Sequence, residues 1–161
     1  MIPNIDFFKG CLKNEFNATL QLIASLPENE LHYKPHPVNR SAREIVEHIL
    51  AHTIDLKIII ENGSCDETMT CDFNSVDEAC KMLTEFWAAV ETSIENLDEN
   101  AWENEPVELL VNGNAFVTLP RFQMMWFFFF DIIHHRGQLS SYVRPMGGKN
   151  PAVYGYSADT L

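Results

Sequence analysis

Four stretches of this chain repeat apolar residues at the spacing of an α-helix, and that repeat limits its possible folds more than any other feature. Side chains three and four positions apart share one face of a helix, so each stretch predicts a helix with a buried face. The stretches lie at about residues 4–26, 41–62, 75–90 and 120–143. Long helices joined by shorter connections are typical of bundles. The sequence therefore predicts an all-α fold, a four-helix bundle, in a single domain over residues 1–161.

Capping residues mark the ends of these helices. Ser41, with Glu44 three positions later, has the pattern of a capping box at the start of the second helix. Ser75 is placed to cap the third helix, and Pro120 suits the first turn of the fourth. The Asn-Gly pair at 62–63 ends the second helix. Each boundary is thus set by local chemistry.

Two connections carry patterns of their own. Residues 64–74 are polar and are expected to form a loop. Residues 106–119 alternate in polarity around Asn112-Gly113, a pair typical of tight hairpin turns. A short hairpin is therefore expected between the third and fourth helices.

The charge of the chain excludes two classes of partner. Eleven Lys and Arg residues face 23 Asp and Glu residues, for a net charge of −12, and no basic stripe is present. Phosphate backbones and anionic membranes need clustered positive charge. The longest apolar run, residues 124–130, is too short to cross a bilayer, and the first residues lack a signal peptide pattern. We expect a soluble, cytoplasmic protein that binds neither nucleic acid nor membrane.

The four cysteines point to no familiar cysteine motif. Cys11, Cys65, Cys71 and Cys80 show no Cys-x-x-Cys spacing, so neither a zinc ribbon nor a thioredoxin-type pair is indicated. Reduced thiols are the expectation. A disulfide between Cys65 and Cys71, in the polar loop, remains an open alternative.

Polar residues interrupt the fourth predicted helix at its most hydrophobic part. Asp131 and His135 are one turn apart, so their side chains project side by side and can ligate one metal ion. An ionised carboxylate among phenylalanines is costly unless it is paired or bound to a metal. The alternative is a structural pair between Asp131 and either Arg136 or His135.

The second predicted helix supplies further candidate ligands. His48 and His52 are also one turn apart, and His52 lies nearer the centre of the apolar stripe, so periodicity slightly favours it. If this helix adjoins the fourth, one of the two histidines completes a three-ligand site with Asp131 and His135. Three protein ligands leave positions open for water or substrate, which is the arrangement of catalytic metal sites.

Two motifs resemble those of the DinB/YfiT-like family. The first is residues 40–49 of the second helix, Arg-Ser-Ala-Arg-Glu-Ile-Val-Glu-His-Ile. The second is His134-His135-Arg136-Gly137-Gln138-Leu139, followed by Tyr142, Arg144, Gly147, Pro151 and Tyr154-Gly155. The likeness extends over most of the chain, including the order of the helices.

The resemblance implies a four-helix bundle with a divalent metal held by three histidines, and commonly a homodimer. Matched position by position, it selects His48 over His52 and gives His135 as the last ligand. The family's remaining histidine falls on Asp131, a departure that shifts preference towards harder ions. The expected metal site is therefore His48, Asp131 and His135, for Zn, Ni, Fe or Mn. The family name refers to induction by DNA damage, as in a stress response, and not to DNA binding.

Two functions follow as hypotheses. The first is a metal-dependent enzyme, a thiol-dependent transferase or a hydrolase acting on a small molecule, with His52 or His134 as support or as acid and base. The second is a metal-binding or structural dimer without catalysis. The dimer is suggested by apolar side chains on the remaining faces of the fourth helix, at Trp126, Phe129, Phe130 and Ile133. Burial of these side chains in the bundle interior and under a packed tail is the alternative explanation.

Overall fold

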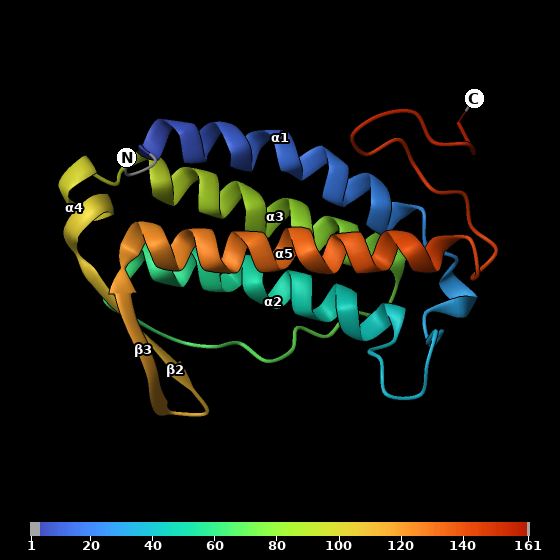
Figure 1. The fold of residues 1–161 in the computed structure, drawn as a ribbon, viewed down its shortest axis with the longest axis horizontal. Helices are drawn as coiled ribbons and strands as arrows, with labels where there is room; N and C mark the ends of the chain where they lie inside the picture. Colours follow the sequence, from blue (N-terminus) through green and yellow to red (C-terminus); the bar gives the residue numbers. More distant parts are fainter. Residues whose placement is uncertain (1–3, 161) are drawn as a thin grey trace.

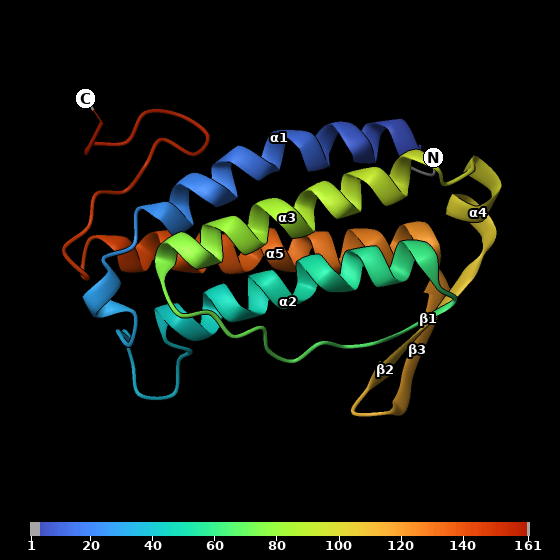
Figure 2. The same cartoon turned by 180° about the vertical axis from the view of Figure 1, so that it is seen from behind.

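A computed structural model of the protein describes residues 4–160. Its four long helices lie side by side (Figures 1 and 2), and they are α1 (Ile5–Ala24), α2 (Ala42–Glu61), α3 (Val76–Glu95) and α5 (Arg121–Val143). Each packs on two others: α1 contacts α3 and α5, and α2 also contacts α3 and α5. All four helices predicted from periodicity are confirmed. None of the helices within residues 4–160 has a stretch long and apolar enough to cross a bilayer.

The predicted caps form the expected hydrogen bonds. The Ser41 hydroxyl accepts from the Glu44 backbone N–H at 3.2 Å, and the Glu44 carboxylate accepts from the Ser41 N–H at 2.6 Å. Ser75 accepts from the Glu78 N–H at 3.1 Å, and so caps α3. These bonds satisfy amides that have no partner inside the helix. The start of α2 is thereby set, and with it the direction of the histidines further along.

A three-stranded sheet corrects the all-α expectation. The hairpin of β2 (Pro106–Val111) and β3 (Asn114–Pro120) is confirmed, with Asn112 and Gly113 at φ 52° and 75°, as a type I′ turn requires. The third strand, β1 (Ser64–Asp66), falls in the segment predicted as a polar loop and pairs in parallel with β2. A strand of three residues has too little local pattern to be recognised, and its partner lies about forty residues further along the chain.

A fifth helix was also not expected. Helix α4 (Glu99–Asn104) has six residues, and a 3-10 turn, η1 (Glu28–Glu30), precedes α2. Asp98 caps α4 by accepting from the Ala101 N–H at 2.9 Å. A helix this short shows less than two turns of periodicity, so only its tertiary contacts distinguish it. Trp102 on α4 is fully buried, with its ring centroid 5.1 Å from that of Phe8.

The aromatic core lies between α1, α3 and α5. Phe129 is 1% exposed and packs edge to face against Phe8, with the ring centroids 5.3 Å apart. Phe129 is therefore a core residue of this chain, as the alternative of burial inside the bundle predicts, and it is not available for the predicted dimer interface. Periodicity identifies an apolar face but cannot tell whether another helix of the same chain covers it.

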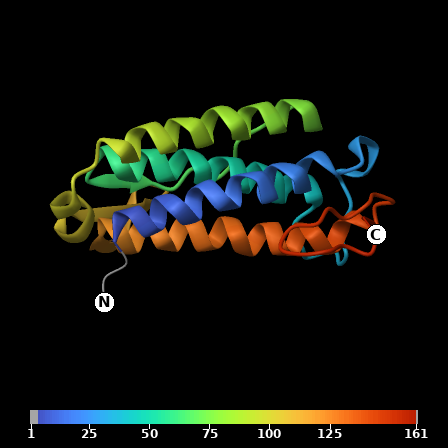
Figure 3. The ribbon, with the colours of Figure 1, turned by 90° about the horizontal axis from the view of Figure 1, so that it is seen from above.

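The end of the chain folds back along α1 and α5. Figure 3 shows residues 144–160 turning back beside the end of α1. Arg136 of α5 is buried, and its guanidinium contacts the Glu15 carboxylate at 2.5 Å and the hydroxyl of Tyr154. The Tyr154 hydroxyl also donates to Glu15 at 2.5 Å. Because Arg136 is committed to this cluster, the alternative pair between Asp131 and Arg136 does not form.

Candidate metal centre

The adjoining helices α2 and α5 bring together the side chains that sequence singled out. His48 and His52 lie one turn apart on α2, with their rings tilted against each other and the centroids 4.0 Å apart. His135 of α5 meets His48 edge to face at 4.6 Å. All three histidines are buried, with 4–9% of each residue exposed. Buried imidazoles gathered from two helices are costly unless each finds a partner.

That partner is a single oxygen of Asp131. Its Oδ2 lies 3.2 Å from His48 Nε2, 3.0 Å from His52 Nε2 and 3.2 Å from His135 Nε2. The ligand atoms of one tetrahedral ion with bonds of about 2 Å lie roughly 3.3 Å apart, so these spacings suit atoms that share an ion. His48, Asp131 and His135 have their ligand atoms within 4.8 Å of one another, as do His48, His52 and Glu67. The cluster could hold a metal ion.

The outer nitrogens of two of the histidines are fixed by hydrogen bonds. Asp55 is fully buried and bonds His52 Nδ1 at 3.1 Å, while its carboxylate accepts from the Thr68 N–H at 3.1 Å. Gln138 Oε1 bonds His135 Nδ1 at 2.9 Å. A carboxylate or amide on the far nitrogen is the usual support of a metal-binding histidine, since it orients the other nitrogen inward.

His48 differs from the other two histidines. Its Nδ1 is buried and has no hydrogen-bond partner within residues 4–160. A buried polar atom without a partner carries a free energy cost, so the position of His48 is explained by its Nε2 and not by its Nδ1. The three Nε2 atoms and the carboxylate that converge at the centre fit the group that the family resemblance implies.

The electrostatics of the cluster favour a charged Asp131. Burial acts to raise the pKa of Asp131, but hydrogen bonds from His135, His48 and His52 outweigh it and hold that pKa far below its usual range. Burial acts to lower the pKa of His52, but the hydrogen bonds to Asp131 and Asp55 raise it to about 9. For His48, burial prevails and lowers the pKa. At pH 7, therefore, Asp131 is ionised, His52 is protonated and His48 is neutral.

The cluster forms the polar floor of a cavity of about 480 Å³. The cavity wall is apolar and comes from the sheet and α5, through Leu109, Val111, Phe116, Phe127 and Phe128. Arg40, at the start of α2, borders the same cavity with its Nη1 3.4 Å from His135 Nε2. An apolar wall with a few converging polar groups is typical of small-molecule sites.

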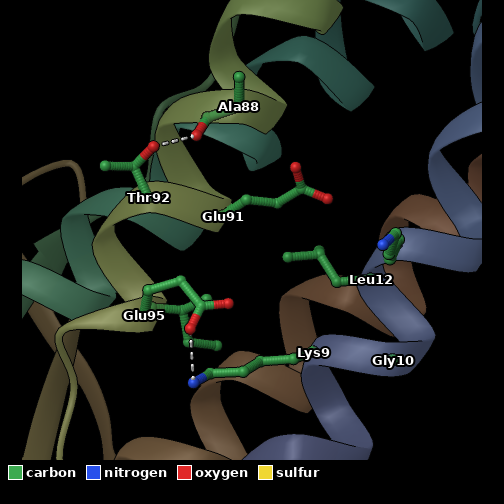
Figure 4. A pocket seen from close by; sticks show the side chains of 9 residues that line it. Lys9, Gly10, Leu12, Ala88, Glu91, Thr92 and Glu95 are labelled. Carbon is green, nitrogen blue, oxygen red and sulfur yellow. Dashed lines mark hydrogen bonds and ion pairs between the residues drawn. The ribbon is translucent and has the colours of Figure 1, made fainter.

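A second groove of similar volume lies elsewhere and has different chemistry. It runs between α1 and α3, where Gly10 and Ala88 are small, and Figure 4 shows its charged residues at the surface. Lys9 pairs with Glu95 at 3.3 Å across it. No histidine lines this groove, and exposed pairs of this kind contribute little energy. The centre between α2 and α5 is therefore the candidate site.

Several side chains of the candidate site were not predicted from the sequence, and one predicted residue lies outside the cavity. Glu67, Asp55 and Arg40 were not predicted at the cluster, although Asp55 gives a signal of the same kind as Asp131, an acid within an apolar helical stripe. Glu67 follows β1 and could not be placed without the sheet. His134 is exposed and does not line the cavity, but its ring lies edge to face against His135, with the centroids 5.1 Å apart, so the supporting role stays a prediction.

The thiols of the chain are not activated. All four cysteines are free, so the disulfide between Cys65 and Cys71 is not formed. Burial raises the pKa of each thiol, and that of Cys65 to about 12, with the Asp55 carboxylate adding to the effect. Since the thiolate is the nucleophile, none of these side chains suits that role.

Fold and site together define a mostly helical protein with a small sheet and a histidine–carboxylate cluster open to a cavity. The chain belongs to the DinB family, whose model matches residues 10–160. No curated protein matches. A DinB-like protein (YjoA) of Bacillus subtilis is similar in structure, with a TM-score of 0.71 at 19% identity over 92% of this chain and 98% of that one. A DinB-like protein of Bacillus cereus has a TM-score of 0.77 at 16% identity, over 96% of this chain and all of the other.

Proposed function

We propose that this protein is a divalent-metal-dependent enzyme that acts on a small molecule, as a thiol-dependent transferase or a hydrolase. The observation that carries the proposal is the convergence of three imidazole nitrogens on Asp131 at the floor of an open cavity. The metal ligands in this proposal are His48, Asp131 and His135. The four long helices are assigned to the four-helix-bundle type, in one domain.

The identity of the metal follows from the donor set. Two imidazoles with one carboxylate suit borderline ions, so Zn²⁺, Ni²⁺, Fe²⁺ and Mn²⁺ are the candidates. A bound ion supplies a Lewis acid that lowers the pKa of a coordinated water or thiol. Because the protein's own thiols are buried with raised pKa values, the thiol in a transfer reaction comes from a small molecule.

The chain's own residues bind and orient the substrate. Phe127 and Phe116 are more than half exposed at the cavity, so they can cover an apolar part of a ligand and exclude water from it. Arg40 is exposed and has no carboxylate partner among residues 4–160, so its guanidinium, which contacts His135 Nε2, can also pair with an anionic group. Asp55 and Gln138 keep the imidazoles aimed at the floor.

The test is metal analysis of protein purified without chelators or an affinity tag. We expect about one equivalent of a transition metal or more in the wild type and a large loss in His135→Ala. The matched control is His134→Ala, which removes the adjacent, exposed histidine and should retain the metal. Substoichiometric metal that His135→Ala does not change would contradict the proposal. Turnover of electrophiles with a panel of cellular thiols, and of hydrolysable substrates without them, then tests the reaction.

A non-catalytic dimer is the second candidate, and one surface favours it. Phe7 and Phe130 are 61% and 58% exposed, and both rings lie against Trp126, with centroids 6.1 and 5.1 Å away. Exposed aromatic clusters of this kind are frequent at protein interfaces. We propose that this surface on α1 and α5 is a homodimer interface. Dimerisation is compatible with either function.

The setting of the protein is part of the same proposal. A net charge of −12 argues against binding to nucleic acid or to anionic membranes. We place the protein in the cytoplasm, where its free cysteines would stay reduced.

A further inference from the structure

The cluster has more ligands than one metal site uses. His48, Asp131 and His135 form one set with ligand atoms within 4.8 Å, and His48, His52 and Glu67 form another. Neither set contains both His52 and His135. His48 directs only its Nε2 to the centre, so it can serve one ion. His52 and Glu67, 3.9 Å apart from Nε2 to Oε1, are then left for a second position.

Asp131 lies between the two positions. Its Oδ2 is 3.2 Å from His135 Nε2 and 3.0 Å from His52 Nε2, so it touches a ligand of each set. Its other oxygen, Oδ1, has no hydrogen-bond or ion-pair partner among residues 4–160, and about a third of the side chain is exposed to the cavity. A carboxylate with one oxygen free can bridge two ions, whereas one imidazole nitrogen binds a single ion.

The hydrogen bonds around His52 are those expected of a metal ligand. Its Nδ1 is bonded by the fully buried Asp55 at 3.1 Å, and the Asp55 carboxylate also accepts from the Thr68 N–H and contacts the Cys65 thiol. Thr68 follows Glu67 directly, so the same backbone contact that positions Asp55 also brings Glu67 to the cavity. A buried carboxylate behind an inward-facing imidazole is the arrangement found around bound metals.

We propose that the cavity floor holds two divalent ions side by side, bridged by Asp131. The first ion is held by His48, His135 and Asp131, and the second by His52, Glu67 and Asp131. Paired ions in enzymes lie about 3.5–4 Å apart and act together on the attacking and leaving groups of a substrate. The proposal rests on the proposed function for the first ion, and it adds the second position and the role of Glu67.

The test uses Mn²⁺ as the probe on the full chain. Protein stripped with a chelator is dialysed against Mn²⁺, and bound metal per chain is measured by mass spectrometry. We expect two Mn²⁺ per wild-type chain and one in Glu67→Gln. The matched control is Glu108→Gln, an exposed carboxylate on β2 that is not part of the cluster, and it should keep two. Circular dichroism confirms that each variant is folded.

A second measurement on the wild type needs no variant. Two bridged Mn²⁺ ions give an exchange-coupled electron paramagnetic resonance spectrum, whereas a single ion gives an uncoupled six-line spectrum. One ion per wild-type chain would overturn the two-ion proposal and leave the proposed function standing. No bound ion would overturn both. Two ions retained in Glu67→Gln would overturn the assignment of Glu67 to the second position.

Discussion

His52 Nε2 lies 3.0 Å from Asp131 Oδ2, although the two residues belong to different helices and are almost eighty positions apart in sequence. The contact joins α2 to α5 at the floor of the cavity and places a third imidazole on the carboxylate that His48 and His135 already contact. Because His52 is also bonded by Asp55, it connects the cluster to β1 and the chain that follows it.

The stability of the metal-free protein should depend on pH through His52. Its pKa is raised from 6.5 to about 9 by Asp131 and Asp55, against the effect of burial. The stabilisation is fully present below about pH 6.5 and is lost as pH rises through about 9, where folded His52 gives up its proton. We expect a loss on the order of 2 kcal/mol. Urea unfolding in the presence of a chelator at pH 6 and pH 8 measures it, since the buried thiols, whose pKa values are also raised, add their own loss only at higher pH.

The control for this pH effect is a pair of glutamine substitutions. His52→Gln should remove most of the pH dependence between pH 6.5 and pH 8, whereas His32→Gln, at an exposed position, should keep it. Curves for wild type and His52→Gln that run parallel from pH 6.5 to 8 would show that His52 does not carry the effect.

Asp55→Asn should weaken metal binding although Asp55 lies outside the proposed ligand sets. The substitution keeps the shape of the side chain but removes the charge that aligns His52 Nδ1. Losses of 10- to 100-fold in affinity are typical for such supporting residues. Competition with a chromogenic chelator for Zn²⁺ measures the change. Asp66→Asn, at an exposed carboxylate that bonds the Gly113 N–H, is the matched control and should bind as the wild type. Equal affinities for both variants would argue against this role.

Gly148→Ala should destabilise the fold without touching the cluster. A Cβ at this position would lie 2.9 Å from the Ser25 carbonyl oxygen and 3.0 Å from Val143 Cγ1, so backbone would have to move. Overpacking of this kind costs about 1–3 kcal/mol. Gly155→Ala meets no atom within 4 Å and should be nearly neutral. Thermal or urea unfolding compares the two, and equal stabilities would mean that the chain end shifts freely.

The oligomeric state should depend on the aromatic surface of α1 and α5. We expect the wild type to be a dimer by light scattering at micromolar concentration. Phe130→Ser should be a monomer, because it removes the exposed ring next to Trp126 from the proposed interface. Phe116→Ser removes a ring on β3 that is somewhat more exposed, at 69% against 58%, and serves as the control. A wild-type monomer would exclude the interface. A dimer in both variants would show that the interface lies on another surface.

Local sequence chemistry was sufficient for the long helices and for most of the cluster. Ser41 with Glu44, and Ser75 before an acidic turn, identify helix starts because capping involves only neighbouring residues. Pairs one turn apart, His48 with His52 and Asp131 with His135, identify the ligand-bearing faces for the same reason. The resemblance to the family then pointed to His48, which the structure places beside Asp131 at 3.2 Å, with His52 equally near.

Tertiary structure decided everything that depends on contacts between distant segments. Strand β1 exists because β2, far along the chain, supplies its hydrogen bonds, and Glu67 reaches the cavity because β1 ends beside it. Phe129 is buried and Phe130 exposed because α1 and α3 cover only one side of α5. By itself, the sequence determined the four long helices and identified His48, His52, Asp131 and His135 as candidate metal ligands, since both follow from spacing along the chain. Which of those residues meet, and in what number, was decided by how α2, α5 and the sheet pack.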